Sequence, residues 1–355
     1  MKNICFLIGN INHSGGTERV TTLIANQLSI DNKIFILSLA CGENPFFEQN
    51  ASIINESLFN ENISMRTNFL MAVSKIRKYI IKNRIDTLIV VDSISCVFTV
   101  PACYGLKINH ICWEHFNLKV NLGSRIRDFG RWMAANWCDK IVTLTERDKI
   151  FWDEKFNLKK SEKVIAIPNP SPYEVQDNSP SLDYKNILSV GRLTHQKGFD
   201  LLILAWAKIS TQLPGWVITI VGSGEDEKKL KKMAIKYNVT KTIIFAGQQK
   251  DMKKFYKSAS FFCMSSRYEG LPMVLLEAQS YGLPIVSFDC NTGPAEIIDS
   301  GENGFLVDNE NIDDLSYKIF KLCKEDRFQN FSKSSLEKSL NFSISNIVLK
   351  WDEIA

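Results

Sequence analysis

The stretch Phe261-Phe-Cys-Met-Ser-Ser-Arg-Tyr-Glu269-Gly-Leu-Pro-Met-Val-Leu-Leu-Glu277 contains the pattern of a strand, a loop and a helix. The apolar run Phe261–Met264 predicts a buried strand. Pro272 lacks an amide donor and has a restricted φ, which predicts a helix over Met273–Ser280. Open parallel sheets bind ligands in the loops that follow their strands, so the polar residues between these two elements predict a binding site.

Two glutamates frame this loop and the first turns of the helix. Glu269 lies in the loop, and Glu277 lies inside the predicted helix, about two turns after Gly270. Unpaired amides near Leu271, Pro272, Met273 and Val274 form a positive helix end, which suits a phosphate. One acid is therefore suited to sugar hydroxyls and the other to a ribose, although a solvated helix start gives the same spacing.

Short apolar runs alternate with helical patterns along the whole chain. Strand, helix and strand in this order predict an α/β fold with doubly wound parallel sheets. The expected strands are 4–8, 34–39, 87–91, 108–113, 140–144, 186–190, 216–221, 242–245, 261–264 and 284–288, with a further strand near Val164 that runs into the interdomain segment.

The pattern restarts after a segment rich in Pro, Ser and Asp, which predicts two similar Rossmann-like domains with a cleft between them. We expect an N-terminal, acceptor-side domain over 1–170 and a linker over 171–183. A C-terminal, nucleotide-sugar-binding domain follows over 184–341. The segment 342–355 has helical spacing and is expected to dock on one domain or to cross between both.

Composition excludes several classes. The chain has 355 residues, of which 45% are hydrophobic and 23% charged, as in globular proteins. Its longest apolar stretch, 87–106, is interrupted by Asp92 and Pro101, so we expect no membrane-spanning helix. Nine cysteines without a Cys-x-x-Cys pair favour reduced packing residues in a cytoplasmic protein. The four histidines lack the spacing of metal ligands, and the sequence contains no Asp-x-Asp motif. A metal site is therefore not supported, and no cofactor is expected.

The net charge of +4 is concentrated near the amino terminus. Residues 1–170 carry 21 Lys and Arg against 16 Asp and Glu, with clusters at Lys75–Arg84 and Arg125–Arg131. A solvated helix face explains these clusters as well as an anionic membrane surface or a phosphate-bearing acceptor does. Nucleic acid is a weaker candidate because neither stretch lies in a recognised binding motif.

Two further loops follow predicted strands. Ser189–Gly198 places the cations of Arg192 and Lys197 on a glycine-bounded loop, where they can neutralise a diphosphate. Gly15 and Gly16 would let the backbone approach an anion, but the loop is not Gly-x-Gly-x-x-Gly, which disfavours a nicotinamide dehydrogenase. Each loop also has an ordinary structural interpretation, as a basic loop or a tight turn.

Three weaker signals accompany these loops. Gly222 and Gly224 could bring the backbone near a base or ribose, or could simply form a turn. His115 could bond a sugar hydroxyl, and a core histidine is nearly as compatible with the sequence. Thr292–Glu296 is expected to be a capped helix start.

Taken together, these motifs resemble the retaining glycosyltransferases of the family 4 type, also termed glycosyl transferases group 1, which have the GT-B fold. The ordered set that carries the resemblance spans nearly the whole chain. It consists of Gly15-Gly16, Gly191-Arg192 with Lys197, Gly222-Ser-Gly224, and Glu269 to Glu277. The segments Glu114-His-Phe-Asn117 and Gly15-Gly-Thr-Glu-Arg-Val20 are most similar to bacterial O-antigen, capsule and exopolysaccharide transferases.

The resemblance implies a role for each matching residue. Arg192 and Lys197 would clamp the diphosphate, while Gly16 would close on it from the other domain. Glu277 would bind the ribose, and both Glu269 and His115 would contact the transferred sugar. The amides of residues 271–274 would contact sugar and phosphate.

The resemblance further implies metal-independent transfer of a hexose or N-acetylhexosamine, with retention of configuration. The donor would be a nucleotide-sugar, and we expect a UDP-sugar. The acceptor would be a lipid-linked oligosaccharide or a lipopolysaccharide or capsule precursor. Such an enzyme would lie in the cytoplasm or on the cytoplasmic face of the inner membrane. Two alternatives remain at this stage, namely a nucleotide-sugar epimerase of the same fold and a non-catalytic partner that binds sugar nucleotides.

Overall fold

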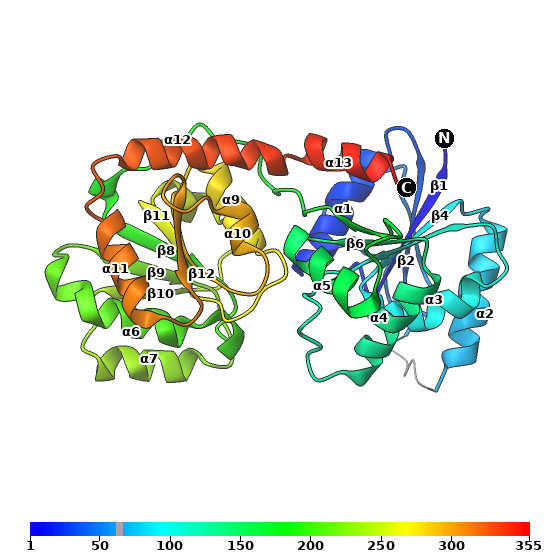
Figure 1. Ribbon diagram of the computed structural model, residues 1–355, viewed down its shortest axis with the longest axis horizontal. Coiled ribbons are helices and arrows are strands. Elements are labelled where there is room, and N and C mark those ends of the chain that lie inside the picture. Colours follow the sequence, from blue (N-terminus) through cyan, green and yellow to red (C-terminus); the bar gives the residue numbers. More distant parts are fainter. Residues whose placement is uncertain (62–66) are drawn as a thin grey trace. The chain divides into compact units, whose positions relative to one another are not determined.

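The computed structural model describes residues 1–61 and 67–355 (Figure 1). Its internal contacts divide the chain into two compact units. Unit 1 comprises residues 1–172 together with 344–355, and unit 2 comprises residues 173–343. Each unit is a parallel β-sheet with helices on its faces, so the predicted α/β class with two Rossmann-like domains is confirmed.

Unit 1 contains a parallel sheet of seven strands in the order β3-β2-β1-β4-β5-β6-β7. Its central strand β4 is buried along its whole length, as expected for a parallel sheet that is covered on both faces. The strands are β1 (Asn3–Ile8), β2 (Lys33–Ser38), β3 (Ile54–Ser57), β4 (Thr87–Val91), β5 (Asn109–Trp113), β6 (Lys140–Thr143) and β7 (Val164–Ala166).

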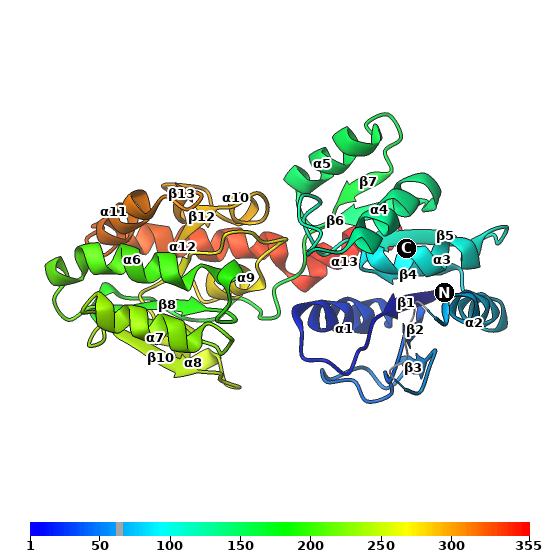
Figure 2. The same ribbon diagram turned by 90° about the horizontal axis from the view of Figure 1, so that it is seen from below.

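Helices cover both faces of this sheet (Figures 1 and 2). One face is covered by α2 (Phe69–Lys82), α3 (Cys96–Cys103), α4 (Arg125–Trp137) and α5 (Glu146–Phe156), whose buried side chains share a core with Cys5 and Leu7. The other face is covered by α1 (Gly16–Leu28), which packs against α13 (Ile344–Asp352). The side chain of Trp351 in α13 is fully buried there, 4.7 Å from the ring of Trp113.

Unit 2 contains a parallel sheet of six strands in the order β10-β9-β8-β11-β12-β13. The strands are β8 (Asn186–Val190), β9 (Val217–Val221), β10 (Ile243–Gly247), β11 (Phe261–Met264), β12 (Ile285–Asp289) and β13 (Gly304–Asp308). The helices are α6 (Phe199–Ile209), α7 (Glu227–Lys236), α8 (Lys253–Lys257), α9 (Met273–Ser280), α10 (Pro294–Ile297), α11 (Ile312–Leu322) and α12 (Phe328–Ser339).

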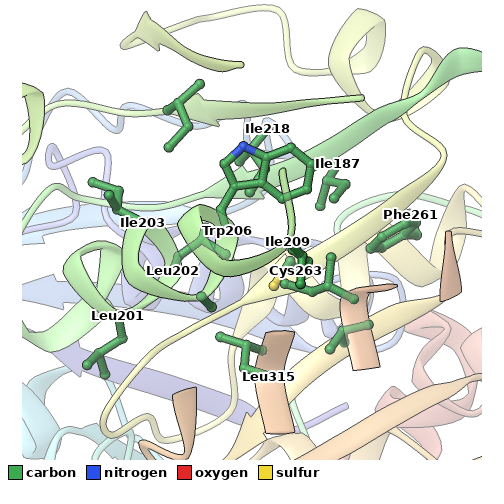
Figure 3. Close-up of a cluster of buried hydrophobic side chains, with 14 of the residues drawn as sticks. Ile187, Leu201, Leu202, Ile203, Trp206, Ile209, Ile218, Phe261, Cys263 and Leu315 are labelled. Atoms are coloured by element: carbon green, nitrogen blue, oxygen red, sulfur yellow. The ribbon is translucent and has the colours of Figure 1, made fainter. Parts of the chain in front are cut away.

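The core of unit 2 forms between α6 and the sheet (Figure 3). Trp206 of α6 is fully buried in the same cluster as Ile187 of β8 and Ile218 of β9. Its indole nitrogen donates a 2.9 Å hydrogen bond to the hydroxyl of Thr242, which satisfies the polar atom of a buried tryptophan. This packing fixes the strands whose loops carry the candidate site.

Most of the predicted strands agree with the structure, and two strands were missed. The helix predicted over Met273–Ser280 is confirmed as α9, and the predicted strands of both halves match the observed ones to within two residues at their ends. The missed strands are β3 and β13 at sheet edges. Within residues 1–61 and 67–355, no helix combines the length and hydropathy needed to cross a bilayer.

Candidate functional site

The polar loops of unit 2 gather at one edge of its sheet. In the strand order, β8 and β11 are neighbours, and the chain moves outward from them in opposite directions, through β9 to β10 and through β12 to β13. This is a topological switch point, where open α/β sheets bind ligands beyond the carboxyl ends of their strands. The loops that follow β8 and β11 carry Arg192, Lys197 and Glu269.

Glycines hold the loops after β8 and β9 against each other. Gly222 has φ +142°, and a Cβ built on it would lie 1.9 Å from the carbonyl oxygen of Gly191. A Cβ on Gly224 would lie 2.4 Å from the carbonyl oxygen of Leu193, whose amide donates to the Ser223 carbonyl at 2.9 Å. The fold alone therefore requires both glycines, which supports the structural interpretation of this motif.

Lys197 and Glu269 form an ion pair across the switch point. The Lys197 ammonium lies 2.6 Å from Oε1 of Glu269, and the two side chains are 17% and 8% exposed. The family resemblance implies separate roles for these residues, with the cation on the diphosphate and the acid on the sugar. The structure brings them together, so an incoming diphosphate would meet a lysine that already has a carboxylate partner.

Several contacts that no sequence motif indicates hold these two loops in register. The Gln196 carbonyl accepts a 2.8 Å hydrogen bond from the Arg267 amide, and the Gln196 side chain donates to the Tyr268 carbonyl at 3.0 Å. The Arg267 guanidinium forms a two-point contact with Asp200, at 2.9 and 2.7 Å. Such a bidentate pair fixes orientation as well as distance. Arg267 thereby positions the loop that contains Glu269.

Arg192 differs from Lys197 in its surroundings. Its side chain is exposed, and its guanidinium makes no hydrogen bond or ion pair with any residue in the described ranges. The loop after β8 therefore presents one solvated guanidinium beside a partly buried, paired ammonium. A guanidinium in this state is available for a two-point contact with phosphate oxygens.

Helix α9 begins at Met273, with Pro272 in extended conformation at its N-cap. Pro272 makes no side-chain cap at this end, and the amides of the first turn are oriented toward the loop edge. Glu277 is 7% exposed, and its Oε2 accepts a 2.6 Å hydrogen bond from the Tyr256 hydroxyl of α8. Tyr256 stacks on Tyr281, with ring centroids 5.1 Å apart, and so holds Glu277 in a fixed orientation.

The loop after β12 supports the Glu269–Pro272 turn. Thr292 was expected to cap a helix start, but the N-cap of α10 is Gly293, without a side-chain hydrogen bond. The Thr292 hydroxyl instead donates to the Glu269 carbonyl at 2.6 Å. Gly293 has φ +100°, and a Cβ on it would lie 2.5 Å from Cδ of Pro272. The helix start predicted within Thr292–Glu296 is therefore observed, but without a side-chain cap, and the Thr292 hydroxyl supports the buried turn instead.

Three predicted residues lie in unit 1. Gly15 is the N-cap of α1 and Gly16 its first residue, at the carboxyl edge of the sheet. A Cβ on Gly16 would meet no atom within 4 Å, so close packing against its neighbours does not explain the glycine. His115 follows β5, is 9% exposed, and has an Nε2 atom without a hydrogen-bond partner among the described residues. An unpaired buried nitrogen is a binding group for a ligand hydroxyl.

The structure corrects the interpretation of the basic stretch Arg125–Arg131. Arg131 is fully buried, and its Nε lies 2.8 Å from Oε2 of the buried Glu114. Arg127 is 7% exposed and pairs with Asp92. These two arginines are therefore unavailable to a membrane surface. They neutralise acids beneath the His115 loop, because a charge buried without a partner is costly.

The buried imidazole of His115 predicts a pH dependence. Burial lowers the pKa of His115 to about 4 from 6.5, although the nearby Glu114 acts in the opposite direction. Between these values the unfolded chain binds a proton that the folded chain does not, so the free energy of unfolding falls as pH drops from 6.5 to 4. The total effect is about 3 kcal/mol.

Chemical denaturation of wild type and His115→Gln at pH 7 and pH 5 measures this effect. Wild type should lose more stability than the variant on acidification. Burial raises the pKa of Asp148 to about 7, which gives a slope of opposite sign, but this contribution is common to both proteins and cancels in the comparison. Parallel pH profiles of the two proteins would contradict the prediction.

The chain resembles known proteins over its whole length. Two family models match, described as "Glycosyltransferase Family 4" over residues 14–175 and "Glycosyl transferases group 1" over residues 173–337. An uncharacterized glycosyltransferase of Haemophilus influenzae is 35% identical over 356 residues, covering all of both chains. The chain belongs to the family 4 glycosyltransferases.

Further relatives of this glycosyltransferase agree with the assignment. The amylovoran biosynthesis glycosyltransferase AmsD of Erwinia amylovora is 30% identical over 366 residues, covering all of this chain and 99% of its own. Among solved structures, the lipopolysaccharide outer core galactosyltransferase WaaB has a TM-score of 0.81 at 20% identity. The alignment covers 99% of this chain and 98% of that structure, and it identifies the fold as GT-B.

Proposed function

We propose that this glycosyltransferase moves a hexose or N-acetylhexosamine from a UDP-sugar to a lipid-linked oligosaccharide or a lipopolysaccharide or capsule precursor, with retention of configuration to give an α linkage. The observation that carries the proposal is the arrangement at the switch point of unit 2. It combines the free guanidinium of Arg192, the Lys197–Glu269 pair, the first-turn amides of α9 and the oriented carboxylate of Glu277.

Each group has a chemical counterpart in the donor. Arg192, Lys197 and the amino end of α9 would hold the diphosphate and neutralise the charge that grows on it as the glycosidic bond breaks. Glu277 would accept hydrogen bonds from ribose hydroxyls, and Glu269 would contact sugar hydroxyls. These cationic and dipolar groups would replace a metal ion. Among the described residues, no group of three or more His, Cys, Asp or Glu side chains has the arrangement of a metal site.

The proposed reaction needs no nucleophilic side chain. The anomeric carbon loses its bond to the diphosphate oxygen, and the acceptor hydroxyl oxygen forms a new bond on the same face of the sugar. The acceptor proton passes to the leaving diphosphate. The role of the protein in this scheme is to position the groups and to stabilise the developing negative charge.

Relatives support the choice of substrates. A Campylobacter jejuni protein that is 26% identical over 99% of this chain is named as an α-1,4-N-acetyl-D-galactosaminyltransferase acting on an undecaprenol-diphosphate-linked acceptor. A probable O-antigen biosynthesis transferase of Escherichia coli is 27% identical over the full length. We extend to this chain the lipid-linked acceptor and a peripheral position on the cytoplasmic membrane face. The exposed cations Lys78, Lys82 and Arg84 would face anionic lipids there.

Thermal unfolding with a panel of UDP- and GDP-sugars tests the donor. Because a ligand that binds the folded state stabilises it, a UDP-sugar at about a hundred times its Kd should add about 2.7 kcal/mol, whereas GDP-sugars should add little. The stabilising donor should then release UDP only when a polyprenyl-diphosphate saccharide is added. Conversion of the UDP-sugar without acceptor would instead indicate an epimerase, and binding without any turnover would indicate a non-catalytic protein.

A further inference from the structure

Unit 1 contains a pocket that has no part in the proposed transfer. It has a volume of about 590 Å³ and lies between the carboxyl end of α3, the start of β5 and the carboxyl end of α4. Its walls are mainly apolar, with Val100, Leu106, Ile108, Met133 and Trp137 among the lining side chains. A pocket of this size and lining is typical of a site for an apolar ligand.

This pocket lies at the opposite edge of the sheet from the transfer residues of unit 1. Ile108 and His110 line it at the amino end of β5, whereas His115 follows the carboxyl end of the same strand. Gly15 and Gly16 also follow the carboxyl end of a strand, β1. An occupant of the pocket would therefore be separated from these groups by the length of the strands.

The polar groups on the pocket floor are already paired within the protein. His110 Nε2 lies 3.0 Å from the Thr99 hydroxyl, and the His110 amide donates to Asp139 Oδ2 at 2.7 Å. No polar ligand is needed to satisfy them. This pairing favours an occupant that offers an apolar chain over a polar metabolite.

Exposed aromatic rings continue from the pocket rim across α4. Tyr104 and Trp137, at the rim, are 80% and 50% exposed, and Trp132 and Phe129 are 44% and 49% exposed. The rings contact one another, with centroid distances of 5.0 Å from Trp137 to Trp132 and 5.6 Å from Trp132 to Phe129. Amphipathic rings of this kind gather where a protein meets a membrane interface.

Cations border the same surface. Arg77 of α2 donates hydrogen bonds to the carbonyls of Ala102 and Tyr104, at 2.9 and 2.7 Å, which places its guanidinium beside the rim. Lys107, in the segment that enters β5, is exposed. A ligand with an apolar chain and an anionic head therefore matches both the interior of the pocket and its border.

We propose that this pocket binds one apolar chain of a phosphate-bearing membrane lipid, with the phosphate near Arg77 and Lys107. The lipid would anchor unit 1 and would not react. The proposal shares a membrane location with the proposed function and requires no step of the transfer reaction. Binding measured without donor or acceptor therefore tests it separately.

Alkyl phosphates with six to ten carbons, below their micelle concentrations, are suitable probes. Binding should change the fluorescence of Trp137, so Trp137→Phe should lose most of the signal while Trp132→Phe retains it. Each added methylene is worth about 0.8 kcal/mol, so affinity should rise about fourfold per carbon until the pocket is full. Equal affinities along the series, or no saturable binding, would overturn the proposal.

A pocket-filling variant separates chain insertion from adsorption to a surface. Val100 lines the pocket and is half-buried, so Val100→Phe should weaken decyl phosphate binding at least about tenfold, whereas Val175→Phe on exposed surface of unit 2 should not. Phosphatidylglycerol vesicles with brominated chains should quench Trp137 less in Val100→Phe than in wild type. Vesicle binding with unchanged quenching, and without monomer binding, would indicate a membrane-adsorbing surface and refute the pocket.

Discussion

Replacing Lys197 with alanine should lower kcat of sugar transfer by about a hundredfold to a thousandfold, the range seen when one preorganised charge-stabilising group is removed. The ammonium lies on the loop at the switch point, where the diphosphate would leave. Its charge matters most as the glycosidic bond breaks, so kcat should fall more than donor binding. Acceptor-dependent UDP release, measured at saturating donor, gives the value.

The control for Lys197→Ala must account for its ion pair with Glu269. The Glu269 carboxylate is only 8% exposed, and Lys197→Ala removes the cation that pairs with it. The variant should therefore also unfold at a lower temperature. The double variant Lys197→Met/Glu269→Gln should recover stability but not turnover. Lys208→Ala removes a cation from an exposed pair with Asp313 in the same unit and should change neither property. Normal turnover in folded Lys197→Ala would refute the assignment.

Replacing Glu277 with glutamine should raise the donor KM by about 10- to 150-fold, because hydrogen bonds to a charged partner are worth about 1.5–3 kcal/mol. The change keeps the side-chain volume and an oxygen for the Tyr256 hydroxyl, so the fold should be retained. The effect on kcat should be smaller, since the ribose lies away from the bond that breaks.

Product inhibition shows whether Glu277 contacts ribose or phosphate. Inhibition by UDP should weaken in Glu277→Gln, whereas inhibition by inorganic diphosphate should not change. Tyr256→Phe keeps the ring that stacks on Tyr281 and removes only the donor to Glu277, so a milder increase in KM is expected. Equal loss of affinity for UDP and diphosphate would place Glu277 at the phosphates and contradict the prediction.

Local patterns were sufficient to predict most of the fold. Apolar runs such as Thr87–Val91 and Phe261–Met264 are fully buried strands, and their signal lies within a few residues. Strand β3 was missed because its side chains are all half-buried and polar residues interrupt it. The short edge strand β13 was also missed. Its first residue, Gly304, packs so closely against β12 that a Cβ built on it would lie 2.0 Å from the carbonyl oxygen of Ile285.

The candidate site was predicted in its residues but not in its pairings. The Lys197–Glu269 contact joins positions 72 residues apart, and the contact between Arg267 and Asp200 joins positions 67 residues apart. No spacing in the sequence encodes such pairs, because they depend on β8 and β11 being neighbours in the sheet. The same limit explains the error at Arg127 and Arg131, whose acidic partners lie on segments distant in sequence.

Helix α13 has a consequence for synthesis of the protein. Unit 1 is completed by residues 344–355, which follow the whole of unit 2 in the chain. Trp351 is fully buried beside Trp113, so the ring of Trp113 lacks this cover until residues 344–355 have left the ribosome. Unit 2 is continuous in sequence and can fold first, although it is translated second. The usual amino-to-carboxyl order of domain folding is therefore reversed for the final packing step.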